Sequence, residues 1–93
     1  MKYMSAFECG GHITGCIDQR NAIQKLFLSS SAHGIPISFV NEGLHGGAPG
    51  GTIFPEPIGQ GMSWNTSLAR KIAEVIAAEA SAIGVDTVFA PVR

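Results

Sequence analysis

Two helical apolar patterns alternate with two short apolar runs, and this order constrains the fold more than any other feature of the sequence. Residues 19–33 form the first pattern, between a predicted N-cap at Asp18 and a stop at Gly34. Its apolar face consists of Ala22, Ile23, Leu26 and Phe27. Residues 35–40, "IPISFV", then form a nearly continuous apolar run, which predicts a strand buried on both faces, as in a parallel sheet.

The second half of the chain repeats this order after a loop at residues 41–63. Asn65 or Thr66 is the predicted cap of a second helix, which runs through Ile83 and ends at Gly84. Its apolar stripe is Leu68, Ile72, Val75, Ile76 and Ile83, and its polar surface is mostly Arg70, Lys71, Glu74 and Glu79. Residues 87–92, "TVFAPV", predict a second short strand. The order predicts a parallel α/β fold.

This α/β pattern is incomplete. A chain of 93 residues has the length of one small domain. Two parallel strands and two helices cannot cover both faces of a sheet, and no helix follows the last predicted strand. We therefore expect the chain to be part of a larger α/β domain.

Charge and hydropathy exclude two classes of partner. Six Lys and Arg residues against seven Asp and Glu residues give a net charge of −1, without the basic stripe that binds nucleic acid. No apolar run approaches the length of a membrane span. The N-terminal "MKYMSAFECGG" lacks the apolar core of an export signal, and the sequence assigns no cellular location.

Motifs for nucleotides and metals are weak. The run "GGAPGGT" has Thr52 where a P-loop needs lysine, and no G-x-G-x-x-G opens a helix, so no nucleotide cofactor is predicted. Cys9, His12 and Cys16 have spacings suitable for zinc, but the nearest fourth ligand is Asp18, which is already the predicted cap. The prediction is therefore no metal site, with the two cysteines either paired or free.

The loop after the first predicted strand holds the candidate binding residues. Parallel α/β proteins collect functional residues beyond the carboxyl ends of their strands. Glu42 lies two residues beyond the predicted strand end at Val40. The simpler alternative is a solvated carboxylate or a cap. His45, beside Gly46, has two interpretations as well, because it can support the loop or contact a ligand.

Four ordered features between Asn21 and Val92 carry a family resemblance. They are "GIP" before a strand with an acidic residue and "HG" after it, "TIFP" followed by "IG", Trp64 before a helix with the pattern A-x-E-A-x-A-x-G, and "APV". Together they resemble the N-terminal domain of glycoside hydrolase family 3, the β-glucosidase and β-xylosidase family.

The resemblance implies a fold of the (β/α)8 TIM-barrel type. A complete barrel takes about 250 residues, so residues 19–93 would be an incomplete, partial barrel of about two to three β/α units. Residues 1–18 match nothing in the family and are unassigned. The rest of the barrel and a second domain would belong to the parent protein.

The resemblance also implies an exo-acting enzyme that cleaves terminal β-linked glucose or xylose by a retaining mechanism with two carboxylates. Glu42 would bind the sugar in the −1 subsite, with His45 and Gly46 as loop support. The nucleophile and the acid/base would lie beyond Arg93, so we expect the 93 residues alone to be inactive. No cofactor is implied, the partner is a β-linked oligosaccharide or glycoside, and many family members are secreted. The alternative is a non-catalytic truncated remnant or a carbohydrate-binding relative.

Overall fold

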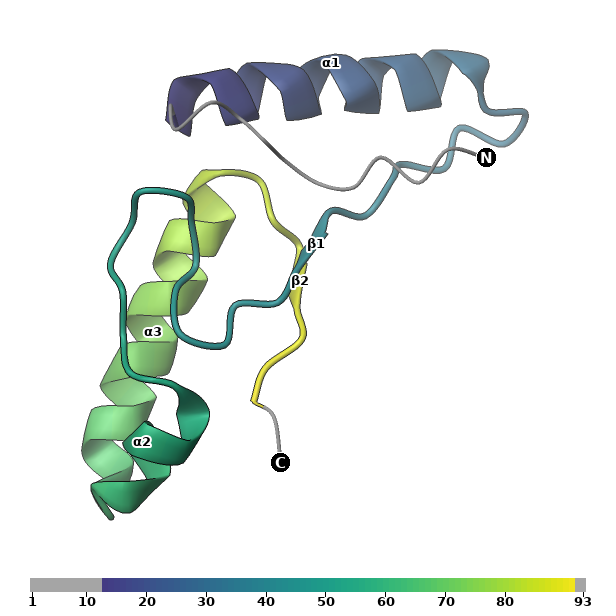
Figure 1. Ribbon diagram of the computed structural model, residues 1–93. Coiled ribbons are helices and arrows are strands. Elements are labelled where there is room, and N and C mark those ends of the chain that lie inside the picture. The colour runs from purple at the N-terminus through teal and green to yellow at the C-terminus, as the bar shows by residue number, and fades with distance from the viewer. Residues whose placement is uncertain (1–12, 92–93) are drawn as a thin grey trace.

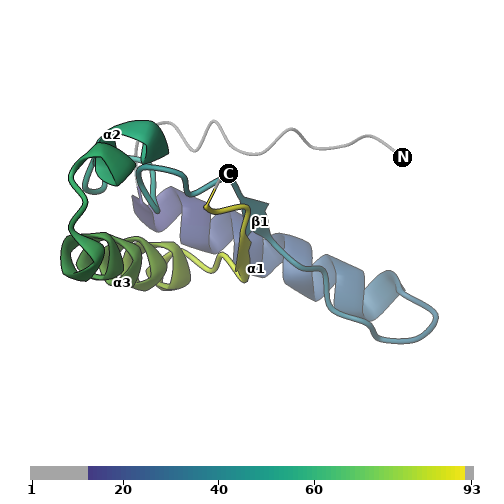
Figure 2. The ribbon, with the colours of Figure 1, turned by 90° about the horizontal axis from the view of Figure 1, so that it is seen from below.

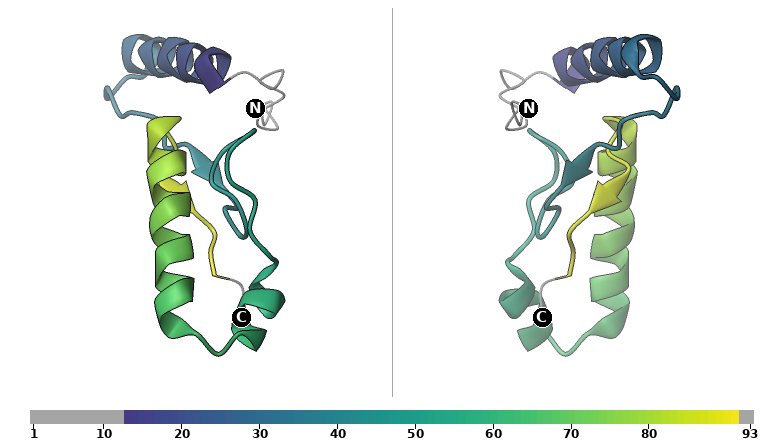
Figure 3. Two further views of the ribbon diagram at one scale, coloured as in Figure 1. Left: turned by 90° about the vertical axis from the view of Figure 1, so that its left-hand side faces the viewer. Right: turned by 90° about the vertical axis from the view of Figure 1, so that its right-hand side faces the viewer.

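The computed structural model describes residues 13–91, which form three helices and one pair of parallel strands (Figure 1). The pair lies beside the longest helix of the second half, with one helix at each end of the molecule (Figure 3). In chain order the elements are α1 (Ile13–Ser30), β1 (Val40–Asn41), α2 (Pro57–Met62), α3 (Thr66–Ala82) and β2 (Thr87–Val88).

Helix α1 is shifted toward the N-terminus relative to the prediction. It begins at Ile13 and runs through Asp18, so the predicted N-cap at Asp18 is wrong; no proline between residues 13 and 18 stops the helix. It ends at Ser30, where the Ser29 and Ser30 hydroxyls donate to the Leu26 carbonyl at 3.0 and 2.6 Å. These hydroxyl bonds compete with the next helical turn.

The apolar face of α1 is only partly covered within the described residues. Leu26 remains 62% exposed and Phe27 37% exposed. Seen from below, α1 extends well beyond α3 (Figure 2), and the radius of gyration of 15.2 Å exceeds the roughly 12 Å of a compact domain of this length. The helix predicted as amphipathic therefore forms, but its stripe is not a core.

The first predicted strand is much shorter than residues 35–40. Only Val40 and Asn41 pair with another strand. Upstream, the Ile37 backbone N–H donates to Gln24 Oε1 at 2.9 Å, and Gln24 Nε2 donates to the Ile37 carbonyl at 3.3 Å. A side chain of α1 thus takes the backbone bonds that a neighbouring strand would otherwise make, and residues 35–39 are extended without belonging to a sheet.

The strand pair is parallel, with Val40 opposite Thr87 and Asn41 opposite Val88. The Phe39 carbonyl accepts from the Asp86 and Thr87 N–H groups at 2.9 and 3.3 Å. The Asp86 carboxylate accepts the Phe39 N–H at 2.9 Å. Both the α/β class and the (β/α)8 barrel stay predictions, because one parallel pair of two-residue strands tests neither of them.

The second strand also ends earlier than predicted. The prediction covered residues 87–92, but β2 ends at Val88, and the last bond toward β1 is from the Phe89 N–H to the Asn41 carbonyl at 2.9 Å. Pro91 has no N–H with which to continue the ladder, and Val92 lies outside the described residues.

Helix α3 is the element that the sequence predicted best. The Asn65 side chain caps it by accepting the Leu68 N–H at 3.0 Å, and Gly84 ends it with a φ of +78°. Ile72 and Ile76 of α3 are buried, and the core cluster gathers at the C-terminal end of the helix around Ala80, Ile83 and Val85, whereas Leu68 and Val75 stay 45% and 39% exposed. Sequence reasoning missed α2, which begins with Pro57 in its first turn.

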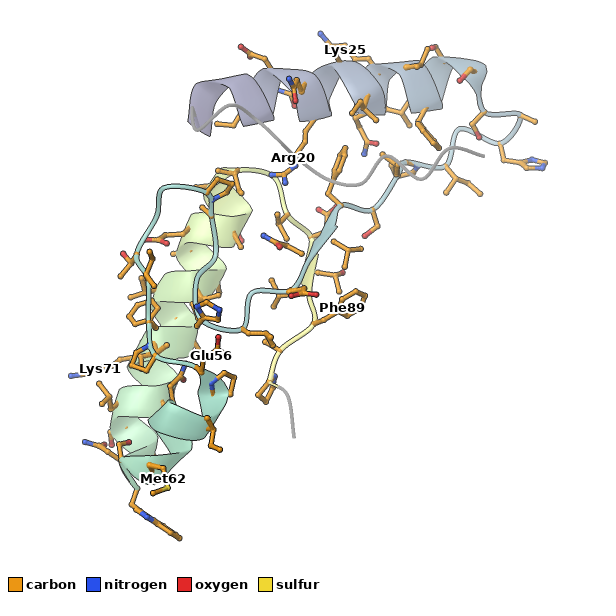
Figure 4. All side chains as sticks on the ribbon, in the orientation of Figure 1. Arg20, Lys25, Glu56, Met62, Lys71 and Phe89 are labelled. Atoms are coloured by element: carbon orange, nitrogen blue, oxygen red, sulfur yellow. The ribbon has the colours of Figure 1, made fainter. Side chains whose placement is uncertain are left out.

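Arg20 links α1 to the end of α3. It is 5% exposed, and its Nη1 donates to the Ile83 carbonyl at the negative end of the α3 dipole. Its guanidinium lies 5.6 Å from the centre of the Phe39 ring. Burial lowers the pKa of Arg20, and the nearby Asp86 carboxylate opposes part of this shift. Figure 4 shows this side chain reaching from α1 toward α3.

The chain between β1 and α2 packs directly on the backbone of α3. A side chain at Gly47 would overlap the Ile76 carbonyl oxygen and lie 3.1 Å from the Ala80 nitrogen. The Gly47 position is buried. Only glycine allows the loop to approach the helix this closely.

Replacing Arg20 by methionine should lower the free energy of unfolding by about 2–4 kcal/mol, because a charged hydrogen bond and a cation–π contact are lost together. Urea unfolding of the protein measures the change. Arg70→Met is the matched control: Arg70 is 82% exposed and pairs only with Glu74 at 2.9 Å in the part of the chain that the structure describes. Such a pair is worth about 0.5 kcal/mol or less. Equal losses would contradict the anchoring role of Arg20.

Replacing Gly47 by alanine should lower the free energy of unfolding by about 1–3 kcal/mol, since the new methyl group must displace α3 or the loop. Gly61→Ala provides the opposite expectation, because a side chain there meets nothing within 4 Å and Gly61 lies inside α2. Alanine in a helix should stabilise by about 0.5–1 kcal/mol. Thermal unfolding of both variants tests the pair, and an unchanged Gly47→Ala melting temperature would show that the loop is not seated on α3.

Candidate functional site

The segment between β1 and α2, residues 42–56, is called the site loop below. It borders an open surface pocket of about 330 Å³ beyond the carboxyl end of β1. The pocket is lined by Asn41, Glu42, Gly43, Leu44, His45, Gly46, Ala48, Gly50, Gly51, Thr52 and Ile53. The structure therefore brings all three sequence-predicted site residues, Glu42, His45 and Gly46, to one pocket.

Glu42 follows β1 directly, and its backbone is held on both sides. Its N–H donates to Asn41 Oδ1 at 2.8 Å, while its own side chain is exposed. Gly43 has a φ of +63°, and a side chain there would lie 2.9 Å from Val88 Cγ1 of β2. The chain must therefore turn sharply after Glu42, and the turn is packed against the neighbouring strand.

His45 joins the two ends of the site loop. Its Nε2 lies 3.1 Å from Glu56 Oε1, and its carbonyl accepts the Phe54 N–H at 2.7 Å. Figure 4 shows Glu56 at the start of α2 with its side chain directed toward the loop. The two side chains are 44% and 63% exposed, so their interaction adds little stability and mainly defines loop geometry.

Gly46 lies where the two sides of the loop approach each other. A side chain at this position would lie 3.2 Å from the Thr52 carbonyl oxygen, which is closer than an ordinary van der Waals contact. The glycine thus allows a narrow loop at the point where His45 reaches across it.

Sequence reasoning missed one contact of the loop. Glu79 of α3 accepts the Thr52 backbone N–H at 3.0 and 3.1 Å and the Thr52 hydroxyl at 2.7 Å. The prediction placed Glu79 on the polar outer surface of the helix, whereas the structure places it under the site loop. A signal was available, because Glu79 is the acidic residue of the A-x-E-A-x-A-x-G pattern.

The site can bind and orient a ligand, but it holds no catalytic pair in residues 13–91. Glu42 is the one carboxylate among the pocket residues of this range. Glu56 lies on the same loop and is directed to His45. Retaining hydrolysis requires two carboxyl groups about 5–5.5 Å apart on opposite sides of the bond.

The metal prediction is not tested by the structure. Within the described residues no group of three His, Cys, Asp or Glu side chains is arranged to hold an ion. However, Cys9 and His12 lie outside the described residues, as does the side chain of Cys16. Among the helices described, none combines the length and the apolar character needed to cross a membrane.

Comparison with known proteins identifies the family. The model of the glycosyl hydrolase family 3 N-terminal domain matches residues 11–93. A lysosomal beta glucosidase of Dictyostelium discoideum is 30% identical over 78 residues, which cover 82% of this chain and 10% of that protein. The chain thus spans about a tenth of the length of this relative. No solved structure is significantly similar to the chain. The resemblance is confirmed, and the chain belongs to the family of the glycosyl hydrolase family 3 N-terminal domain.

Proposed function

We propose that the chain contributes the −1 sugar-binding loop of an exo-acting glycosidase that removes terminal β-linked glucose or xylose. The observation that carries this proposal is the pocket beyond β1, because Glu42 is one of the residues that line it. The chain's membership of the family supports the same role. Its volume of about 330 Å³ lies at the lower end of the range for small-molecule sites, roughly 300–1,000 Å³. The Dictyostelium relative, by its name a beta glucosidase, supports the same class of reaction.

The chemistry of the ligand explains why a carboxylate is suited to this position. A neutral sugar offers the protein only hydroxyl groups, and a carboxylate can accept hydrogen bonds from two of them. Such charge-assisted bonds are stronger than bonds between neutral groups. Glu42 is exposed on the pocket side of a backbone turn that β2 holds in place, so its carboxylate is available to a ligand.

In the proposed mechanism this chain binds the sugar, and other parts of the protein supply the catalytic carboxyl groups. The nucleophile and the acid/base would come from other parts of a (β/α)8 barrel, in which residues 19–93 form the early β/α units. In such barrels the loops after the strands meet at one face, where binding and catalytic residues are combined. Glu42 would orient the sugar and take no part in proton transfer. No cofactor or metal enters this scheme.

Replacing Glu42 by glutamine should lower kcat/KM on aryl β-glucosides or β-xylosides by roughly tenfold to a hundredfold or more. The change keeps the size of the side chain and removes charge-assisted bonds worth about 1.5–3 kcal/mol. The melting temperature should barely change, because the side chain is exposed and belongs to no core. Kinetics on the full-length enzyme, with the folded fraction measured in parallel, check this expectation.

Glu56→Gln is the matched control on the same loop. Glutamine can still accept a hydrogen bond from His45 at this exposed position, so the loss should stay below about threefold. Full activity of Glu42→Gln on both substrates would overturn the proposed role of Glu42. If the full-length protein hydrolyses no glycoside yet binds one, a carbohydrate-binding relative would replace the enzyme.

A further inference from the structure

We propose that Glu79 of α3 is a positioning residue that sets the conformation of the site loop and thereby the place of Glu42 in the pocket. This inference rests on the proposed sugar-binding function of the loop. It starts from the contact between Glu79 and Thr52, which joins residues 27 positions apart. Both oxygens of one carboxylate bind a single residue of the loop, through its backbone and its hydroxyl.

The Thr52 N–H is shared between both oxygens of Glu79, and Oε1 also accepts the Thr52 hydroxyl. The Thr52 N–H lies 3.1 Å from Oε1 and 3.0 Å from Oε2, and the Thr52 hydroxyl lies 2.7 Å from Oε1. A carboxylate accepts at every one of these positions, whereas a glutamine would present its NH2 group to one of the donors. Glu79→Gln is thus nearly equal in shape but replaces one of the two acceptor oxygens by a donor NH2 group.

The carboxylate also lies directly against the loop backbone. A side chain at Gly51 would lie 2.5 Å from Glu79 Oε2 and 3.1 Å from the Ala48 carbonyl oxygen. The site loop therefore packs against α3 at two places, at Gly47 against the helix backbone and at Gly51 against the Glu79 side chain. The loop therefore has little freedom to move along α3.

The contact is transmitted through the loop to the pocket. Thr52 and Gly51 line the pocket themselves, and the Gly51 N–H donates to the Ala48 carbonyl at 3.0 Å. Two residues after Thr52, the Phe54 N–H bonds to the carbonyl of His45, which lies on the segment leading from Glu42. A shift of Thr52 would thus move both sides of the pocket. Glu79 acts through these contacts and does not face the sugar.

The test compares Glu79→Gln with Glu74→Gln in the full-length enzyme, using an aryl β-glucoside and free glucose as a competitive inhibitor. Glu74 lies on the same helix and pairs with Arg70 on the exposed surface. We expect Glu79→Gln to lower kcat/KM about tenfold and to raise the inhibition constant of glucose by a similar factor. Glu74→Gln should leave both unchanged. Activities are normalised to folded protein by circular dichroism.

The outcomes separate this inference from the proposed function. An enzyme that loses activity with Glu42→Gln and keeps wild-type kinetics with Glu79→Gln would overturn the positioning role alone. A loss with Glu79→Gln that matches only the loss of folded protein, with glucose inhibition unchanged, would also overturn it. A wild-type protein without glycosidase activity or glucose binding would overturn the proposed function instead.

A second variant decides the matter if Glu79→Gln does not fold. Thr52→Val removes the hydroxyl bond and keeps the backbone bonds, so kcat/KM should fall about threefold and the glucose inhibition constant should rise. Where Glu79→Gln does fold, adding Thr52→Val to it should cause no further loss, because the two residues act through one contact. An unchanged Thr52→Val, or losses that multiply, would contradict the inference.

Discussion

The parallel pairing of β1 with β2 is the constraint on which the rest of this structure depends. It brings residues 39–41 beside residues 86–89, and the Asp86 carboxylate extends it by binding the Phe39 N–H at 2.9 Å. All chain between the two strands must then cross over through α2 and α3, as parallel strands require. The end of β1, and with it Glu42, is thereby placed next to Val88 of the neighbouring strand.

Helix α3 makes contacts with most other parts of the structure, through its apolar side chains, its backbone and one carboxylate. Its apolar stripe provides the buried residues Ile72, Ile76 and Ala80, and the Ile83 carbonyl at its C-cap accepts a hydrogen bond from Arg20 of α1. Its backbone also accepts the loop at Gly47, and its Glu79 holds Thr52. One helix therefore joins the strands, α1 and the site loop, and the core cluster of Ala80, Ile83 and Val85 lies at its C-terminal end, with Ala48 and Val88 packed against it.

The sequence predicted features that arise from local chemistry and missed those that arise between distant residues. The cap at Asn65, the end of α3 at Gly84 and the place of Glu42 after a strand follow from residue types and their immediate neighbours. The short extent of β1 could not be predicted, because it depends on Gln24 taking the backbone bonds of Ile37. The role of Glu79 likewise depends on a partner 27 positions away, and helix periodicity alone made it a surface residue.

The site loop is held by many weak contacts, and this has a consequence for binding. The His45–Glu56 pair is largely exposed and adds little by itself, as do the bonds of Gln60 to the Pro55 and Leu44 carbonyls at 2.7 and 3.5 Å. With the glycine contacts on α3, however, they restrict the loop from several directions at once. A loop that is ordered before the ligand arrives loses less conformational entropy on binding. An exposed carboxylate such as Glu42 can then be held in a defined place without being buried, which leaves it accessible to the hydroxyl groups that it is proposed to bind.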